Sequence, residues 1–230
     1  MMKSFLLTIV FIPTALFIAC GDSGRIVEEV EEPIVDGAVY SVSFIQQYVV
    51  ADSFEVKSSK DNSQVLRVQT SGERHSGERY YNTFNDNTFK RRIVPFTNKA
   101  IFNTFVKLDI VSDSDFDELH KAGVSLSDIV RFVGMSAADY IRGGCTEMYD
   151  WEMAPVIYET VKWSNYQTGY APVEALLSAI GEGDLVLIDP LFFLYFEQRP
   201  TLSKIHNLTL TVTDNTGKTL TATWQQTFRE

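Results

Sequence analysis

Three carboxylates around a tryptophan form the group of residues in this chain that is best spaced for catalysis. Asp150 and Glu152 flank Trp151, and Glu159 follows shortly after them. Glycoside hydrolysis uses such carboxylate pairs, and an aromatic side chain beside them suits a sugar. On a strand, however, residues 150 and 152 share one face, where solvated neighbours are the ordinary outcome. A carboxylate-based glycoside hydrolase is therefore the third-ranked hypothesis, and we predict that the chain is not an enzyme.

A second group of acidic residues has the spacing of a cation ligand set. Asp113, Asp115 and Asp117 occupy the first, third and fifth positions of a polar turn, as at the start of a calcium loop. An EF-hand also needs Gly at position six and Glu at position twelve, where this chain has Glu118 and Val124. The alternative is a turn that ends a strand, because Asp and Ser favour caps and turns. The three aspartates are a weak metal candidate only, and we predict neither a metal nor a cofactor.

The histidines and cysteines match no pattern of a zinc site or a hydrolytic triad. His75, His120 and His206 are scattered along the chain, and the motifs G-x-S-x-G and G-x-x-x-x-G-K-[ST] are absent. A reactive thiol needs a nearby base. We therefore expect Cys145 to be buried or chemically idle.

Aromatic and cationic side chains alternate in the polar stretch 71–99 and its surroundings. Arg79, Tyr80 and Tyr81 lie at its centre. The cations are Arg67, Arg74, Arg79, Lys90, Arg91 and Arg92, and the aromatic residues are Tyr80, Tyr81, Phe84 and Phe89. This mixture suits contact with a glycan or an acidic partner, whereas the alternative is a solvated loop with its aromatic side chains folded inward. Together with Tyr149 and Trp151, the three central residues are the predicted binding residues.

The N-terminus predicts export and a lipid anchor. Lys3 precedes a nearly unbroken apolar run that ends at Ala19, and Cys20 follows directly. A basic, an apolar and a small-residue region in this order are typical of a secretory signal, and the run is shorter than the roughly 20 residues of a membrane span. The cysteine resembles that of a bacterial lipobox, which implies cleavage before Cys20 and attachment of diacylglycerol to its thiol. The alternative is a secretory signal without a lipid.

We therefore expect a signal peptide at 1–19 and a lipidated cysteine followed by an acidic tether at 20–37. The tether is rich in Gly and Glu and cannot bury enough apolar area to fold. The expected location is the cell envelope, as an outer-membrane lipoprotein whose face, periplasmic or surface, stays open.

Composition limits what the rest of the chain can be. Hydrophobic residues make up 45% of the chain and aromatic residues 13%, which is enough for a real core. The formal net charge of −10 argues against nucleic acid as a partner, because nucleic-acid binding requires a cationic footprint. The length suits one mainly β domain at 38–230, with a division near 85–100 as the alternative.

Hydrophobic alternation predicts strands over most of that domain. The clearest signals are a strand at 102–111 and a hairpin whose strands, 208–213 and 220–224, flank the turn Asp214–Lys218. Further strands are expected at 39–50, 54–57, 65–68, 80–84, 156–163, 185–188 and 191–196. Helical spacing and capping residues predict helices at 125–132, 136–142 and 172–180. We therefore predict an immunoglobulin-like antiparallel β-sandwich with two or three short helices in its connections.

Two stretches carry a family resemblance. FVKLDIVSDSDFDELHKAGVSLSDIV (105–130) and APVEALLSAIGEGDLVLIDPLFFLYFEQRPTLSKIHNLTLTVT (171–213), together with the signal, resemble small uncharacterised lipoproteins of Bacteroidota, a family described only as a domain of unknown function. The resemblance brings no active site to this chain. The sequence as a whole favours a lipid-anchored, extracytoplasmic, non-catalytic module that binds a glycan or an envelope or host protein. The alternative is a structural envelope protein that acts through a protein partner.

Overall fold

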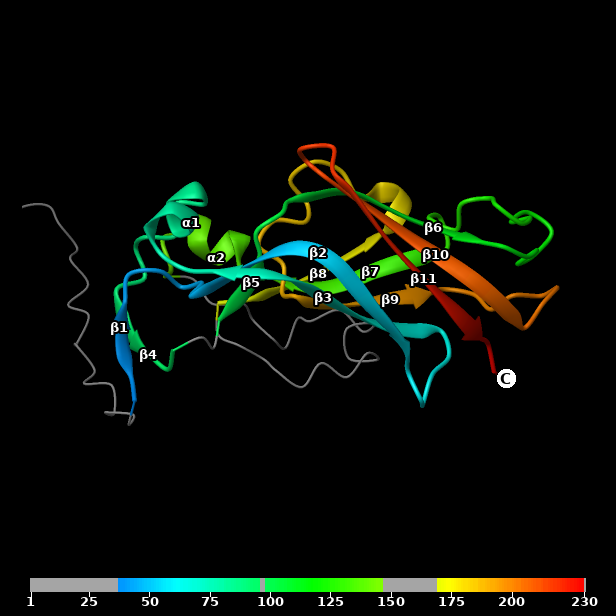
Figure 1. The fold of residues 1–230 in the computed structure, drawn as a ribbon, viewed down its shortest axis with the longest axis horizontal. Helices are drawn as coiled ribbons and strands as arrows, with labels where there is room; N and C mark the ends of the chain where they lie inside the picture. The colour runs from blue at the N-terminus through cyan, green and yellow to red at the C-terminus, as the bar shows by residue number, and fades with distance from the viewer. Residues whose placement is uncertain (1–36, 96–97, 147–168, 230) are drawn as a thin grey trace, which may run out of the picture. The chain divides into compact units, whose positions relative to one another are not determined.

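Six strands lie side by side in the largest sheet, in the order β5-β2-β3-β9-β7-β8. The computed structural model describes residues 37–95, 98–146 and 169–229, which all belong to one compact unit spanning Ile34–Glu230. The six strands are β2 (Gln47–Ser58), β3 (Val65–His75), β5 (Lys99–Ile101), β7 (Val130–Ser136), β8 (Ala171–Leu176) and β9 (Leu191–Phe196) (Figure 1). Strands β2 and β5 run parallel, and the other neighbours run antiparallel.

A second sheet of three antiparallel strands packs against the first. Its order is β11-β10-β6, with β6 (Phe105–Ser112), β10 (Ile205–Asp214) and β11 (Thr219–Thr227). Inward-facing residues alternate along its strands, as in Leu208, Leu210 and Val212 of β10. They pack with Leu66, Phe132, Phe192, Leu194 and Phe196 of the large sheet in one buried cluster, the first core. The two sheets therefore form a sandwich-like arrangement.

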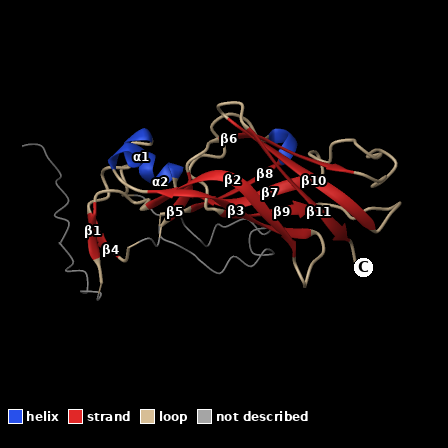
Figure 2. Ribbon diagram, in the orientation of Figure 1, coloured by secondary structure: helices blue, strands red, loops and turns tan. Residues whose placement is uncertain are grey.

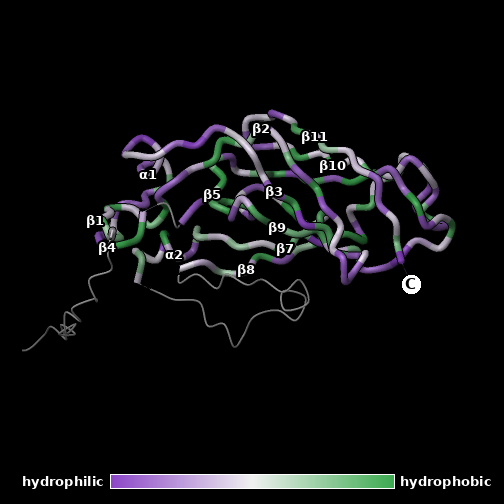
Figure 3. Tube along the Cα trace, turned by 60° about the horizontal axis from the view of Figure 1, so that its bottom comes forward, coloured by the Kyte–Doolittle hydropathy of each residue, from purple (hydrophilic) through white to green (hydrophobic). Residues whose placement is uncertain are grey.

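The opposite face of the large sheet is also buried. Val65, Val133 and Met135 alternate with residues of the first core and belong to a separate cluster, the second core. Tyr140 and Ile141 of helix α2 (Ala138–Arg142) are buried in it, and Tyr80 and Tyr81 of helix α1 (Glu78–Thr83) pack against it. Because β9 is covered on both faces, it is hydrophobic along most of its length (Figure 3).

A third, two-stranded sheet forms beside the second core. Strand β1 (Val39–Ser41) pairs antiparallel with β4 (Arg91–Ile93), and we call this pair the β1–β4 ribbon. A single 3₁₀ turn, η2 (Leu177–Ala179), follows β8. Figure 2 shows how little of the described chain is helical. No helix in the described ranges is long and apolar enough to cross a membrane.

The predicted mainly β fold, with packed sheets and short helices in the connections, is confirmed. The hairpin is confirmed in register: Leu208 pairs with Trp224, and Val212 pairs with Leu220. The strand predicted at 102–111 is observed as β6. One pair departs from the predicted antiparallel arrangement, since β5 runs parallel to β2.

Four predicted elements are wrong, and the strand expected at 156–163 lies outside the described residues. The segment expected to be a strand at 185–188 makes only two isolated bridges, Leu185 with Phe105 and Ile188 with Ser136. The helix expected at 125–132 is an irregular segment leading into β7, and the helix expected at 172–180 is β8 followed by η2. Conversely, the strand expected at 80–84 is mostly helix α1. Pro172 lies on β8, which pairs only with β7 at the edge of the sheet, where a missing N–H is tolerated.

Candidate functional site

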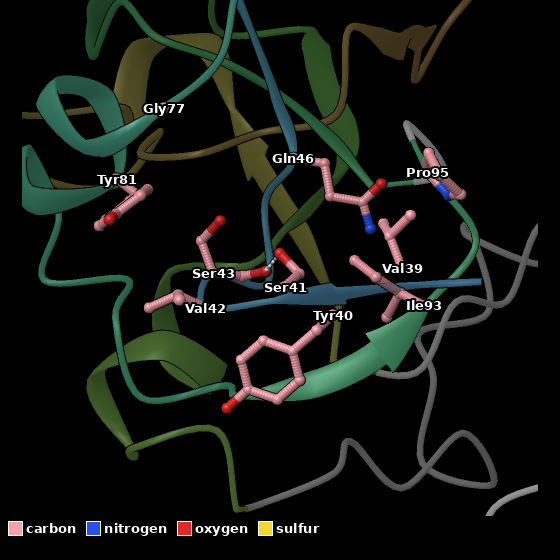
Figure 4. Close-up of a pocket in the computed structure, with 10 residues that line it drawn as sticks. All are labelled: Val39, Tyr40, Ser41, Val42, Ser43, Gln46, Gly77, Tyr81, Ile93 and Pro95. Atoms are coloured by element: carbon pink, nitrogen blue, oxygen red, sulfur yellow. Dashed lines mark hydrogen bonds between the residues drawn. The ribbon is translucent and has the colours of Figure 1, made fainter.

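A pocket of about 250 Å³ lies between the β1–β4 ribbon and the start of α1 (Figure 4). The register of the ribbon pairs Val39 with Ile93, and both residues line the pocket. The described residues that line the pocket are Val39, Tyr40, Ser41, Val42, Ser43, Gln46, Gly77, Tyr81, Ile93 and Pro95. Paired residues of an antiparallel ribbon share one face, so the inner face of the ribbon forms one wall.

The segment between β1 and β2 is held by its own hydroxyl groups. The Ser41 hydroxyl donates to the Ser43 carbonyl, and the Ser43 hydroxyl donates to the Ile45 carbonyl, each at 2.8 Å. The Lys90 N–H donates to the Val42 carbonyl at 3.3 Å, which extends the ribbon beyond β4. These bonds fix the wall of the pocket that β1 provides.

Asp86 anchors the same segment from beneath. Its buried carboxylate accepts the backbone N–H groups of Phe44 at 2.7 Å and Ile45 at 2.8 Å, and the Tyr48 hydroxyl at 3.3 Å. Burial raises the pKa of Asp86 above its ordinary value, although these three hydrogen bonds oppose the shift. The carboxylate is absent from the pocket lining, so Asp86 positions the wall without contacting a ligand.

The described lining combines apolar and aromatic side chains with a few uncharged polar groups. Apolar and aromatic side chains dominate, and the Ser41 and Ser43 oxygens, whose hydrogens point to carbonyls, can accept hydrogen bonds. Tyr81 lines the pocket from helix α1 (Figure 4). No Asp, Glu, His, Cys, Lys or Arg is among the described lining residues. The polar side chains among the described lining residues are therefore the hydroxyl groups of serine and tyrosine and the amide of Gln46.

Only one of the predicted binding residues lines the pocket. Tyr81 does so, whereas the Tyr80 ring stacks on His75 at a centroid distance of 4.6 Å and packs against the second core. Arg79 is exposed on α1. Tyr149 and Trp151 lie outside the described residues, as do Cys20 and the carboxylates at 150, 152 and 159.

Sequence reasoning missed the residues of the ribbon. Val39, Tyr40 and Val42 alternate with serines and were interpreted as part of a longer strand over 39–50. In the structure the chain bends after β1, and β2 begins only at Gln47. The pairing of β1 with β4 joins segments about fifty residues apart in the sequence, and no local sequence pattern predicts it.

The three aspartates of the weak metal candidate each have their own protein partners. Asp113 accepts the Asn207 backbone and side-chain N–H groups at 2.9 and 2.6 Å, and Asp115 accepts the Ala122 N–H at 2.9 Å. The pKa of each is lowered by these bonds. In the described ranges no group of three or more His, Cys, Asp or Glu side chains is arranged to hold a metal ion.

Asp117 instead forms part of a histidine-centred network. Both of its oxygens lie 2.8 Å from His120 Nδ1, and Asp128 lies 3.1 Å from His120 Nε2. Burial works against a charged imidazole, but the two carboxylates outweigh it and raise the pKa of His120. Because both ring nitrogens are occupied, His120 serves to hold the loop that follows β6.

A buried serine–histidine pair was also missed. Ser112 Oγ lies 2.8 Å from His206 Nδ1, and His206 Nε2 lies 2.8 Å from the Ser203 carbonyl. Since a carbonyl only accepts, Nε2 carries the proton and Nδ1 accepts the hydroxyl. The distance suits a catalytic pair. His206 is, however, fully buried and Ser112 is only 2% exposed, so no substrate reaches them and the pair joins β6 to β10.

Cys145 is buried in the second core, as expected. Its sulfur accepts the Thr88 hydroxyl at 3.4 Å, and burial raises the pKa of the thiol. Both properties disfavour the reactive thiolate.

The chain matches no protein-family model, no curated protein and no solved structure. Function is therefore argued from the geometry of the site.

Proposed function

We propose that this chain is a lipid-anchored, extracytoplasmic binding protein without catalytic activity, and that the pocket between the β1–β4 ribbon and α1 holds the end of a glycan. The observation that carries the proposal is the lining itself, whose described residues provide apolar and aromatic walls with hydroxyl oxygens and include no acidic, basic or thiol side chain. Small-molecule sites have this composition, and their volumes are usually about 300 Å³ or more. A volume of about 250 Å³ therefore suits a small ligand such as a terminal sugar.

A glycan fits this lining better than a purely apolar ligand does. The ring of Tyr81 offers a flat face for the C–H groups of a sugar, and the oxygens of Ser41 and Ser43 accept from its hydroxyl groups. The absence of charged lining residues favours a neutral sugar at this position.

The anchor, the family and the finer fold class are part of the same proposal. The lipobox-like Cys20 supports an outer-membrane lipoprotein related to those of Bacteroidota, and Cys20→Ala is expected to abolish acylation as measured by mass spectrometry. The packed sheets support an immunoglobulin-like sandwich. The usual immunoglobulin domain divides seven antiparallel strands between two sheets. Here the large sheet alone has six described strands, and its β2–β5 pair is parallel.

A thermal-shift screen against neutral oligosaccharides tests the pocket. A ligand at a hundredfold excess over its Kd stabilises the folded state by about 2.7 kcal/mol, which raises the unfolding midpoint. Tyr81→Ala removes an aromatic wall of the pocket, and Ser41→Leu fills the pocket. We expect each variant to abolish the rise in the unfolding midpoint. The matched control is Leu119→Ser in a distant loop, where the side chain is 82% exposed. A screen without any hit, or a hit that survives both pocket variants, contradicts the proposal.

One observation favours the second candidate, a structural protein that acts through a protein partner. Strand β11 is a nine-residue edge strand with no Pro and no charged residue, and such edges can pair with another chain. This role predicts concentration-dependent association without a small ligand, measured by sedimentation. The Thr223→Pro variant is expected to abolish that association, while Thr223→Val leaves it intact.

A further inference from the structure

The outer face of the β1–β4 ribbon combines exposed apolar and cationic side chains. Tyr40 is 63% exposed, and its cross-strand partner Arg92 is exposed beside it on the same face. The Tyr40 ring points away from the side chains of Ser41 and Ser43 (Figure 4), although Tyr40 also belongs to the pocket lining. Val42, at 37% exposure, and Val94, at 45%, flank this pair along the two chains.

The ribbon is also a local concentration of positive charge in an acidic chain. The segments 39–43 and 89–95 contain Lys90, Arg91 and Arg92 and no carboxylate, whereas the whole chain has a net charge of −10. None of these three cations takes part in an ion pair of the described residues. Arg91 lies over the Phe89 ring at 5.7 Å from its centroid.

We propose that the outer face of the β1–β4 ribbon docks on an anionic lipid surface. Aromatic rings settle at the level of the lipid headgroups, and each Lys or Arg nearby adds attraction to anionic lipids. Tyr40 and the two valines supply the interfacial contact, and Lys90 and Arg92 contact the phosphates. The acidic remainder of the molecule is repelled, so the cationic ribbon turns toward the membrane.

The position of the ribbon in the chain favours a membrane over an acidic protein. Val39 lies nineteen residues after Cys20, so the ribbon follows the proposed lipid anchor closely in the sequence. The proposed lipid anchor would therefore keep the ribbon at high effective concentration beside the bilayer. This argument rests on the anchor of the proposed function. The docking face shares Tyr40 and Val42 with the pocket lining, whereas its cations Lys90 and Arg92 are not lining residues.

Vesicle co-sedimentation tests the docking face on residues 34–230, which contain both cores and form one compact unit. We expect binding to vesicles of phosphatidylcholine with phosphatidylglycerol, weaker binding to phosphatidylcholine alone, and loss of binding at high salt. Lys90→Gln and Arg92→Gln should each weaken partitioning by roughly fivefold. Tyr40→Ser should weaken it on both kinds of vesicle, because it removes the interfacial ring.

Lys60→Gln and Arg67→Gln each remove one positive charge from an exposed position away from the ribbon and are the matched controls. Equal binding to neutral and anionic vesicles, or equal loss in the controls, overturns the proposal. Binding of poly-glutamate through Arg92 without binding to vesicles overturns it in favour of an acidic protein partner. Unchanged unfolding midpoints exclude misfolding of the variants. If an oligosaccharide still raises the unfolding midpoint of Arg92→Gln, membrane docking and binding in the pocket are separate functions.

Discussion

At the scale of single residues, two described carboxylates with raised pKa values, those of the buried Asp86 and the half-buried Asp189, accept hydrogen bonds from the backbone. Asp86 accepts two backbone N–H groups beneath the pocket wall, and Asp189 accepts the Leu191 N–H at 2.8 Å at the start of β9. Burial raises the pKa of both side chains, and that of Asp189 to about 6. A raised pKa in a cleft often marks a catalytic acid. Here neither residue lines the pocket, so the shifts reflect desolvation in a structural role.

The shift at Asp189 predicts a specific pH dependence of stability. Between pH 3.8 and 6 the unfolded chain has lost the Asp189 proton while the folded chain retains it, so stability falls as the pH rises through this window. The full loss amounts to about 3 kcal/mol and is complete above pH 6. Asp189→Asn keeps an acceptor for Leu191 but cannot ionise, so the variant should gain stability relative to the native chain across the window.

Urea unfolding of both proteins from pH 3.5 to 7.5 measures this difference. The difference in unfolding free energy between the two proteins is compared at each pH because Asp113, Asp115 and Asp117 have lowered pKa values. These three residues add stability as the pH rises, which is opposite to the effect of Asp189. Parallel profiles for the two proteins would show that Asp189 titrates normally.

At the scale of elements, the β2–β3 ladder bends where it passes from one core to the other. Its register shifts between Ala51 and Ser53, opposite Gly72. A Cβ on Gly72 would lie 1.9 Å from the Val50 carbonyl oxygen, so only glycine permits the two backbones to approach this closely. The bend lets the start of β2 reach the second core while its remainder covers the first.

Gly72→Ala is therefore expected to force the two strands apart. Overpacking of this kind typically costs about 1–3 kcal/mol, and we expect the upper part of that range because the clash is with backbone. Chemical denaturation measures the change, with Ser71→Ala as the exposed neighbouring control. A loss below about 0.5 kcal/mol, which is usual for a surface substitution, would argue against the close approach.

The elements predicted well from the sequence are those whose signals are local. The β10–β11 hairpin has alternating residues on both strands and a turn with Gly217 at a positive φ of 84°, so its register follows from neighbouring residues. Strand β7 has no such alternation, because Phe132 and Val133 point into different cores. A short apolar run buried on both faces has the same pattern as a buried helix, and pairing with β8 and β9 decides the outcome.

The candidate site was predictable only where it is aromatic. Tyr81 was selected because it lies among cations and rings in a polar stretch, and it does line the pocket. Tyr80 gave the same signal, yet it is not among the lining residues and its ring stacks on His75. The difference arises from α1, which was expected to be a strand. The opposite pocket wall requires the pairing of Val39 with Ile93, which depends on tertiary structure.

At the scale of the whole described unit, the two cores share one sheet. Strand β7 contributes Val130 and Phe132 to the first core and Val133 and Met135 to the second. If one core loses its packing, it exposes one face of strands whose other face packs in the other core. We therefore expect residues 34–230 to unfold as one cooperative unit, although the clusters are separate.

Two core truncations test this coupling. Leu210→Ala in the first core and Ile141→Ala in the second each remove a buried aliphatic side chain, and each should lower the free energy of unfolding by about 2–5 kcal/mol. If the sheet couples the cores, both variants will show a single transition in which far-ultraviolet circular dichroism and tyrosine fluorescence coincide. An early partial transition confined to Ile141→Ala would instead mean that the second core unfolds by itself. The candidate pocket would then rest on a separately melting subdomain, and ligand binding would stabilise only that early transition.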